Sequence, residues 1–201
     1  DTDTGEILAQ ASEKYDLIDG LPPGHLEQHP ADWLRAVDAT VESCLQQIGD
    51  RRKDVRGMGV SGQQHGFVPL DAQDRVIRPA KLWCDTSTAA ECDVLAEAFG
   101  GAAGLISRAG NAIPPGFTAP KILWLKRHEP EHFARLASVL LPHDYITFHL
   151  TGQKRMEYGE ASGTGLLDVR TRTWAGDLID VIDPRVREML PPVGSSLEKN
   201  G

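Results

Sequence analysis

The sequence is poor in cysteine and lacks any long apolar run, and each shortage excludes a class of protein. Its three cysteines, Cys44, Cys84 and Cys92, stand far apart with no C-x-x-C pair, so neither a disulfide framework nor a zinc site is expected. No stretch approaches the roughly 20 apolar residues of a membrane span, and the first residues lack the pattern of a signal peptide. We therefore expect a cytoplasmic protein with no membrane partner.

Basic residues are also in short supply. The sequence holds 21 lysines and arginines against 29 aspartates and glutamates, which gives a formal net charge of -8 at pH 7. A protein that binds a nucleic-acid backbone needs a basic face, and the only basic run, Arg51–Lys53, is followed at once by Asp54. We expect no nucleic-acid partner and interpret the basic run as a solvated loop.

The chain does have enough apolar mass for one globular domain. Hydrophobic residues make up 40% of its 201 positions and charged residues 25%, a balance typical of folded proteins. Residues 30–48 show the clearest pattern, because apolar side chains recur there every three or four positions. Pro30 in the first turn and Gly49 just past the end predict the bounds of an amphipathic helix that faces the core.

The other expected elements mix helices and strands, as in an α/β domain with both hairpins and crossovers. DTDTG at 1–5 predicts a turn, and the residues after it alternate like a strand leaving a hairpin whose entering strand is absent from the sequence. Further strands are expected at 55–60, 80–85, 139–142 and within 161–174, with a hairpin turn in 70–77. Helices are expected from a capping box at Thr88 and Glu91 to Phe99, over 117–139 with a break at Glu129–Pro130, at 144–152 and from 177 onward.

Several cofactor signatures are weak or missing. Residues 57–62 read G-x-G-x-x-G, but a dinucleotide fingerprint opens a helix whose N-terminus meets the pyrophosphate, whereas here the glycines run on into QQHGFVPLD and a hairpin. We therefore disfavour a dehydrogenase. His128 and His132 have a metal-ligand spacing, but they straddle the break at Pro130, so no metal site is expected.

The segment SGQQHG at 61–66 places two glutamines and a histidine between glycines, and two interpretations stay open. The three side chains form a satisfied network in the core, or they face a polyhydroxylated ligand that the glycines allow to approach. Trp83 and Asp85 end the next predicted strand, where α/β proteins gather ligand sites. Trp83 is equally suited to the core, and Asp85 to a helix cap.

Residues 116–128, GFTAPKILWLKRH, resemble the first signature of the FGGY carbohydrate kinases, with its Lys-x-x-Trp spacing at Lys121 and Trp124. SGQQHG, LWCD, LLPHDYITFHLTG and EASGT resemble further segments of that family, so the likeness covers nearly the whole chain. The resemblance implies an α/β fold of the ribonuclease-H-like type found in actin and hexokinase, with a mixed sheet, flanking helices and its first strand lacking here. It implies that Lys121 and Trp124 have a structural role in helix packing.

The resemblance also implies substrate-binding roles. Gln64 and His65 fall where these kinases contact ketose hydroxyls, and Trp83 and Asp85 fall at the edge of that pocket. The implied reaction is phosphorylation of D-xylulose to D-xylulose 5-phosphate with ATP and Mg²⁺. One departure is Glu157, where relatives tend to have aspartate, and its extra methylene puts a hydrogen bond there in doubt.

FGGY kinases have two domains, and residues 1–201 resemble only the N-terminal, sugar-binding one. The D-x-G-T turn, the catalytic aspartate and the ATP-binding domain have no counterpart in the sequence. We therefore expect a domain incomplete at both ends, with no catalytic residue, no bound ATP, Mg²⁺ or other metal, and no activity alone. The expected partners are a small ketose, the missing C-terminal domain and a second copy in a homodimer. A non-catalytic sugar-binding or interaction module is the alternative.

Overall fold

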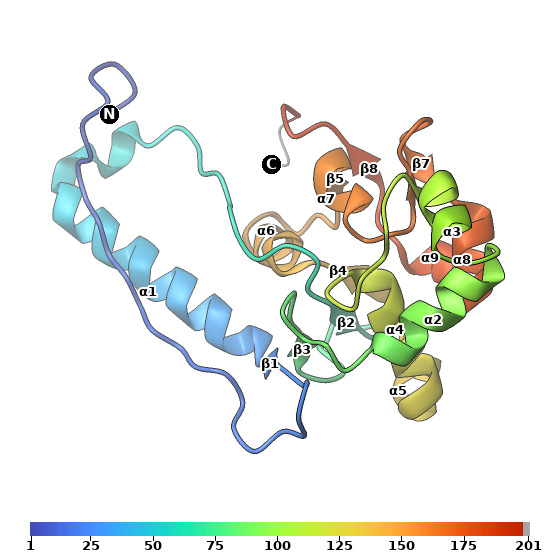
Figure 1. Ribbon diagram of the computed structural model, residues 1–201. Helices are drawn as coiled ribbons and strands as arrows, with labels where there is room; N and C mark the ends of the chain where they lie inside the picture. Colours follow the sequence, from blue (N-terminus) through green and yellow to red (C-terminus); the bar gives the residue numbers. More distant parts are fainter. Residues whose placement is uncertain (199–201) are drawn as a thin grey trace.

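Short paired strands surrounded by helices build the fold of residues 1–198, the part of the chain that this computed structural model describes (Figure 1). Three of the strand pairs are antiparallel: β1 (Glu27–Gln28) with β3 (Ala80–Lys81), β2 (Val68–Leu70) with β4 (Ser138–Leu140), and β6 (Leu167–Asp168) with β7 (Thr173–Trp174). Strand β5 (Met156–Glu157) runs parallel to β8 (Val193–Gly194). A bridge between Phe67 and Lys81 joins the first two pairs, so their strands form one strip.

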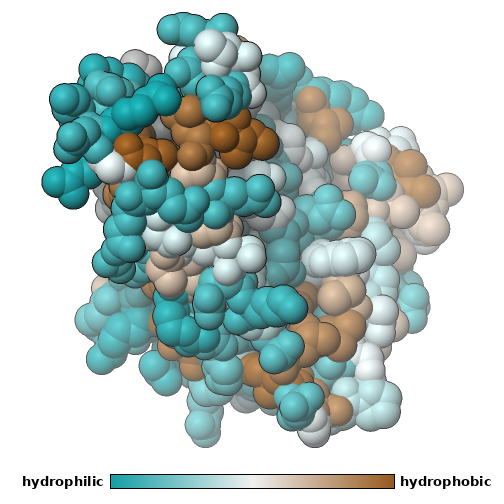
Figure 2. All heavy atoms as spheres, turned by 90° about the vertical axis from the view of Figure 1, so that its left-hand side faces the viewer, coloured by the Kyte–Doolittle hydropathy of each residue, from teal (hydrophilic) through white to brown (hydrophobic). Residues whose placement is uncertain are grey.

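Helix α1 (Pro30–Ile48) begins and ends where the sequence predicts, and Gly49 ends it with a φ of 54°. Its contribution to the core is smaller than expected, because only Pro30, Trp33 and Ala36 near its start are buried. The predicted apolar stripe is half-buried, since the helix and the 3-10 helix η1 (Gly49–Asp54) project from the body of the molecule (Figure 1). Apolar side chains therefore remain visible on this face (Figure 2).

The helices after η1 are α2 (Ala89–Ala98), α3 (Ala102–Ala109), α4 (Thr118–His128), α5 (Pro130–Arg135), α6 (Pro142–Thr151), α7 (Tyr158–Ser162), α8 (Gly176–Ile182) and α9 (Val186–Met189). Helices α2, α5 and α8 contact α4. Ile122 and Leu125 of α4 are fully buried in the largest apolar cluster. The predicted break between α4 and α5 at Glu129 is confirmed, whereas α3 and α7 were not predicted.

Two predicted strands are not formed. Residues 5–15 and 55–60 form no strand, and neither stretch pairs with another strand among residues 1–198. Ile7 and Met58 lie in solvent, 78% and 58% exposed, while Leu8 and Val60 are half-buried. A strand exists through the backbone hydrogen bonds of its neighbour, so an alternating pattern without a neighbour does not produce one.

The capping box predicted at the start of α2 is also wrong. Thr88 is the residue before the helix, but its hydroxyl donates to the carbonyl of Pro115 at 2.9 Å. Glu91 turns instead to Arg127 of α4, with 2.8 Å between Oε1 and Nη1. Both side chains are buried, so their tertiary partners replace the local cap.

No helix among residues 1–198 is both long and apolar enough to cross a bilayer.

Candidate functional site

Residues 61–66 form an open loop ahead of β2, and this loop divides its polar side chains between the interior and the solvent. Gln63 is half-buried, and its Nε2 donates to Oε1 of the buried Gln28 at 3.0 Å. Gln64 is exposed, and His65 is half-buried with a backbone φ of 57°. The core-network interpretation therefore applies to Gln63, whereas Gln64 is exposed and His65 is half-buried without a hydrogen bond at its buried Nδ1.

The imidazole of His65 lies between an aromatic ring and a glycine. It stacks on Phe117 with 4.4 Å between ring centroids and 28° between planes. A Cβ on Gly163 would come within 2.2 Å of the imidazole Cε1, so the ring fits only because that residue is glycine. Nδ1 is buried against the Gly163 backbone without a hydrogen bond of ordinary geometry.

The electrostatic surroundings keep this imidazole neutral at pH 7. Burial, with a further contribution from the nearby charge of Lys121, holds the pKa of His65 below its usual range. A neutral imidazole offers one donor and one acceptor, which suits hydroxyl groups.

Trp83 lies in the turn after β3 and is 51% exposed. The loop before α4 passes directly over this turn, because a Cβ on Gly116 would lie 2.4 Å from the Trp83 carbonyl oxygen. Nζ of Lys121 donates to the carbonyls of both Gly116 and His65. These contacts bring the Trp83 turn and the His65 loop to the same corner of the molecule.

Asp85 lies two residues after Trp83 but is fully buried. Its Oδ2 accepts from the Leu26 amide at 2.9 Å and from Nζ of Lys81 at 3.2 Å, while Oδ1 accepts from the amide and hydroxyl of Ser87. Burial opposes its charge, but these hydrogen bonds outweigh it and lower the pKa of Asp85. Both oxygens are engaged within the chain, so Asp85 fixes the turn that presents Trp83.

A buried lysine that sequence reasoning missed stands beside this aspartate. His25, Glu27 and Asp85 have ligand atoms within 4.8 Å of one another, as a metal site would require. Nζ of Lys81 already fills that position, at 3.2 Å from His25 Nδ1, Glu27 Oε1 and Asp85 Oδ2. The ammonium group of Lys81 occupies the position that a metal ion would take, so these three residues do not fit a metal ion. The sequence holds no local signal for this cluster, because its members meet through the β1–β3 pairing.

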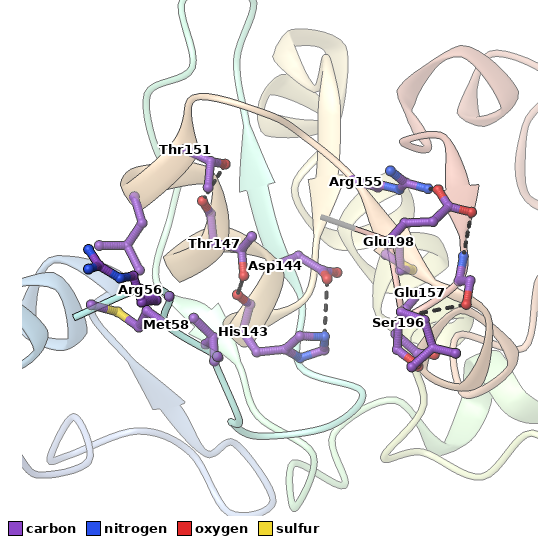
Figure 3. Close-up of a pocket in the computed structure, with 17 residues that line it drawn as sticks. Arg56, Met58, His143, Asp144, Thr147, Thr151, Arg155, Glu157, Ser196 and Glu198 are labelled. Carbon is purple, nitrogen blue, oxygen red and sulfur yellow. Dashed lines mark hydrogen bonds and ion pairs between the residues drawn. The ribbon is translucent and has the colours of Figure 1, made fainter. Parts of the chain in front are cut away.

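A pocket of about 770 Å³ adjoins the loop, lined by residues 56–60, by α6 and the residues after it, and by 195–198 (Figure 3). Nε2 of His143 faces Oδ1 of Asp144 at 3.1 Å. Burial raises the pKa of Asp144, while for His143 the pairing with Asp144 outweighs burial and raises its pKa. The sequence marked this segment only through the family resemblance, and gave the pair no role.

ATP and Mg²⁺ do not fit the side chains of this pocket as they stand. Arg155 is already paired with Glu198. The carboxylate of Glu157 accepts from the backbone amides of Gly159 and Glu160 at the start of α7, so it is not free for a cation. Residues 57–62 lead into the loop and β2 rather than into a helix, so their glycines do not form a dinucleotide fingerprint.

The chain matches a known protein family and is similar to proteins that have been named. The profile described as FGGY family of carbohydrate kinases, N-terminal domain, matches residues 1–201. The chain is 37% identical to the xylulose kinase of Haemophilus influenzae, over 98% of the chain and 41% of that protein. It is 39% identical to the xylulose kinase of Escherichia coli, over 98% of the chain and 39% of that protein. The chain thus spans about two fifths of the length of these relatives.

Solved structures show the same likeness. The crystal structure of xylulose kinase from Rhodospirillum rubrum superposes with a TM-score of 0.87 and 27% identity, covering 98% of this chain and 40% of that one. The neighbours are sugar kinases of the actin and hexokinase-like ATPase fold, which confirms the predicted fold class.

Proposed function

Because the chain belongs to the FGGY family of carbohydrate kinases, we propose that the protein it represents phosphorylates a ketose with ATP, and that D-xylulose is its substrate. In this proposal residues 1–201 are the N-terminal, sugar-binding domain. A C-terminal domain supplies the ATP and Mg²⁺ site and the catalytic base, and this chain alone is inactive. The names of the similar proteins support the substrate, and the unmatched three fifths of their length support the second domain.

One observation carries the sugar-binding part of the proposal, namely the division of the loop at 61–66. Gln63 is bonded to Gln28, whereas Gln64 is exposed and the half-buried His65 has a lowered pKa, which favours the neutral imidazole. An amide and a neutral imidazole each provide a donor and an acceptor, which is the set that a polyhydroxylated ligand requires. Trp83 is half-exposed in the turn that Gly116 contacts, and Asp85 holds that turn in place.

The proposed site distinguishes a sugar from an analogue that lacks one of its hydroxyl groups. A pocket built to hydrogen-bond hydroxyls rejects an analogue that lacks one by about 10⁴-fold, because the protein groups are then left unsatisfied. Orientation of the sugar contributes to catalysis as well, since phosphoryl transfer depends mainly on positioning and charge stabilisation. Gln64 and His65 thus contribute by orienting the ketose, with its terminal hydroxyl towards the second domain.

The proposal includes a cytoplasmic location. Cys44, Cys84 and Cys92 are free thiols, which agrees with a reducing compartment where ATP is available. A homodimer stays a prediction.

The decisive experiment uses the protein as its gene encodes it. Wild type, Gln64→Ala and His65→Ala are assayed with ATP, magnesium and a panel of ketoses. We expect D-xylulose to be the best substrate and kcat/KM to fall by about ten-fold or more in each variant, the value of one or two hydrogen bonds. Gln46→Ala, on the exposed face of α1, is the matched control and should behave as wild type.

Two results would count against the proposal. No ketose phosphorylation by the wild-type protein, with ketose binding retained, would favour the non-catalytic sugar-binding module. Unchanged kcat/KM in both variants would return Gln64 and His65 to a structural role.

A further inference from the structure

The backbone of His65 adopts a conformation that needs support. Its φ of 57° lies in the left-handed region, which is unfavourable for a residue with a side chain. Such residues persist where the surrounding structure holds them, and they cluster at functional sites. His65 is also the residue whose imidazole the proposed ketose site presents.

The support comes from the first turn of α4. Nζ of Lys121 donates to the His65 carbonyl at 3.0 Å and also to the Gly116 carbonyl. The hydroxyl of Thr118 donates to the same His65 carbonyl at 3.1 Å. Thr118 and Lys121 are both fully buried, so neither bond competes with water. An ammonium group has three hydrogens and a neutral amine two, so either form of Lys121 can serve the two carbonyls.

The same turn of helix also holds the ring. Phe117, the residue just before α4, stacks on the imidazole. Lys121 therefore fixes the backbone of His65 while Phe117 and Gly163 fix the direction of its side chain.

We propose that Lys121 is a positioning residue for the ketose site, because its amino group ties the His65 loop to the Gly116 loop and so sets where the imidazole lies. The inference rests on the proposed function and deepens it. It gives Lys121 a positioning role in addition to the helix packing expected from the sequence. Lys121 also helps to lower the pKa of His65, so its removal has an electrostatic as well as a geometric effect.

The test compares Lys121→Met with wild type in the full-length protein, labelled with ¹⁵N at histidine. Methionine keeps the length of the side chain but has no hydrogen to donate. The His65 signals are assigned from a His65→Gln spectrum. We expect the pKa of His65 to rise towards its usual range, and KM for D-xylulose to rise about ten-fold with a smaller change in kcat.

Lys126→Met is the matched control, since Lys126 lies on the same helix and also donates to a backbone carbonyl, that of Ile182. It should leave the His65 signals unchanged. Thr118→Val is the second variant, needed if Lys121→Met does not fold. It removes the other donor to the His65 carbonyl, and should shift the His65 signals and raise KM.

Two outcomes overturn the inference. The first is a folded Lys121→Met protein with wild-type His65 signals and wild-type KM, and the second is the same result for Thr118→Val when Lys121→Met is unfolded. A wild-type protein that does not act on ketoses would defeat the proposed function instead. The His65 signals would still show whether Lys121 sets the imidazole position, so the two failures are distinguishable.

Discussion

Nζ of Lys81 lies 4.0 Å from the centre of the Trp124 ring, so the ammonium group of a strand residue rests on an aromatic face of α4. The same nitrogen pairs with Glu27 and Asp85. Lys81 is fully buried, and a buried ammonium is tolerated only with such partners. The contact ties the family-signature helix to the turn that carries Trp83.

Replacement of Lys81 by methionine should strongly destabilise the fold. The substitution leaves the buried carboxylates of Glu27 and Asp85 without their common cation, and breaking a buried ion pair from one side costs about 3–5 kcal/mol. The free energy of unfolding, measured by urea denaturation, reports the loss. Lys53→Met, on the exposed η1, is the control, and an equal effect of both substitutions would refute the account of Lys81.

Gly163→Ala should move the His65 ring rather than unfold the protein. The added Cβ would overlap the imidazole, and a side-chain ring can turn away at a cost of about 1–3 kcal/mol. We expect kcat/KM for the ketose to fall and the histidine ¹⁵N spectrum to change. Gly57→Ala adds a methyl group where no atom lies within 4 Å, so it should change neither kcat/KM nor the histidine ¹⁵N spectrum. A wild-type spectrum for Gly163→Ala would contradict the contact.

Trp83→Phe should abolish any change of tryptophan fluorescence on D-xylulose binding. Trp83 is half-exposed at the proposed site, whereas Trp174 lies in β7 and its indole nitrogen donates to the Pro191 carbonyl. Stability should change by less than about 1 kcal/mol, as is usual for exposed positions. Trp174→Phe should keep the signal. If Trp174→Phe loses it and Trp83→Phe keeps it, Trp83 is not at the sugar site.

Stability should rise with pH because of Lys121. Burial lowers the pKa of Lys121 from 10.5 to about 7 in the folded chain. Between these values the unfolded chain holds a proton that the folded chain has released, so raising the pH favours folding, by at most about 1.4 kcal/mol per pH unit. Urea unfolding from about pH 7 to about pH 9.5 should show this slope in wild type. The difference in stability between wild type and Lys121→Met should grow with pH, and a constant difference would refute the lowered pKa.

Local sequence pattern was sufficient for several elements of this protein. The bounds of α1 follow from Pro30, Gly49 and an apolar repeat, and the α4–α5 break follows from Pro130, because these signals act within one turn of helix. The glycines around residues 63–65 left a core network and a bound ligand both open, and the family resemblance assigned Gln64 and His65 to the ligand. In the structure Gln64 is exposed and His65 half-buried, and their sugar-binding role stays a prediction.

The arrangement of the polar groups depends on contacts between residues far apart in the chain. Gln63 and Gln64 are chemically identical, yet only Gln63 meets Gln28, which lies 35 positions away. Lys121 reaches the His65 carbonyl across 56 positions, and Asp85 is saturated by partners that folding brings to it. A donor and its acceptor are paired by packing, and no spacing along the chain records that pairing. Which polar side chain faces a sugar and which holds the protein together is therefore a property of the folded chain.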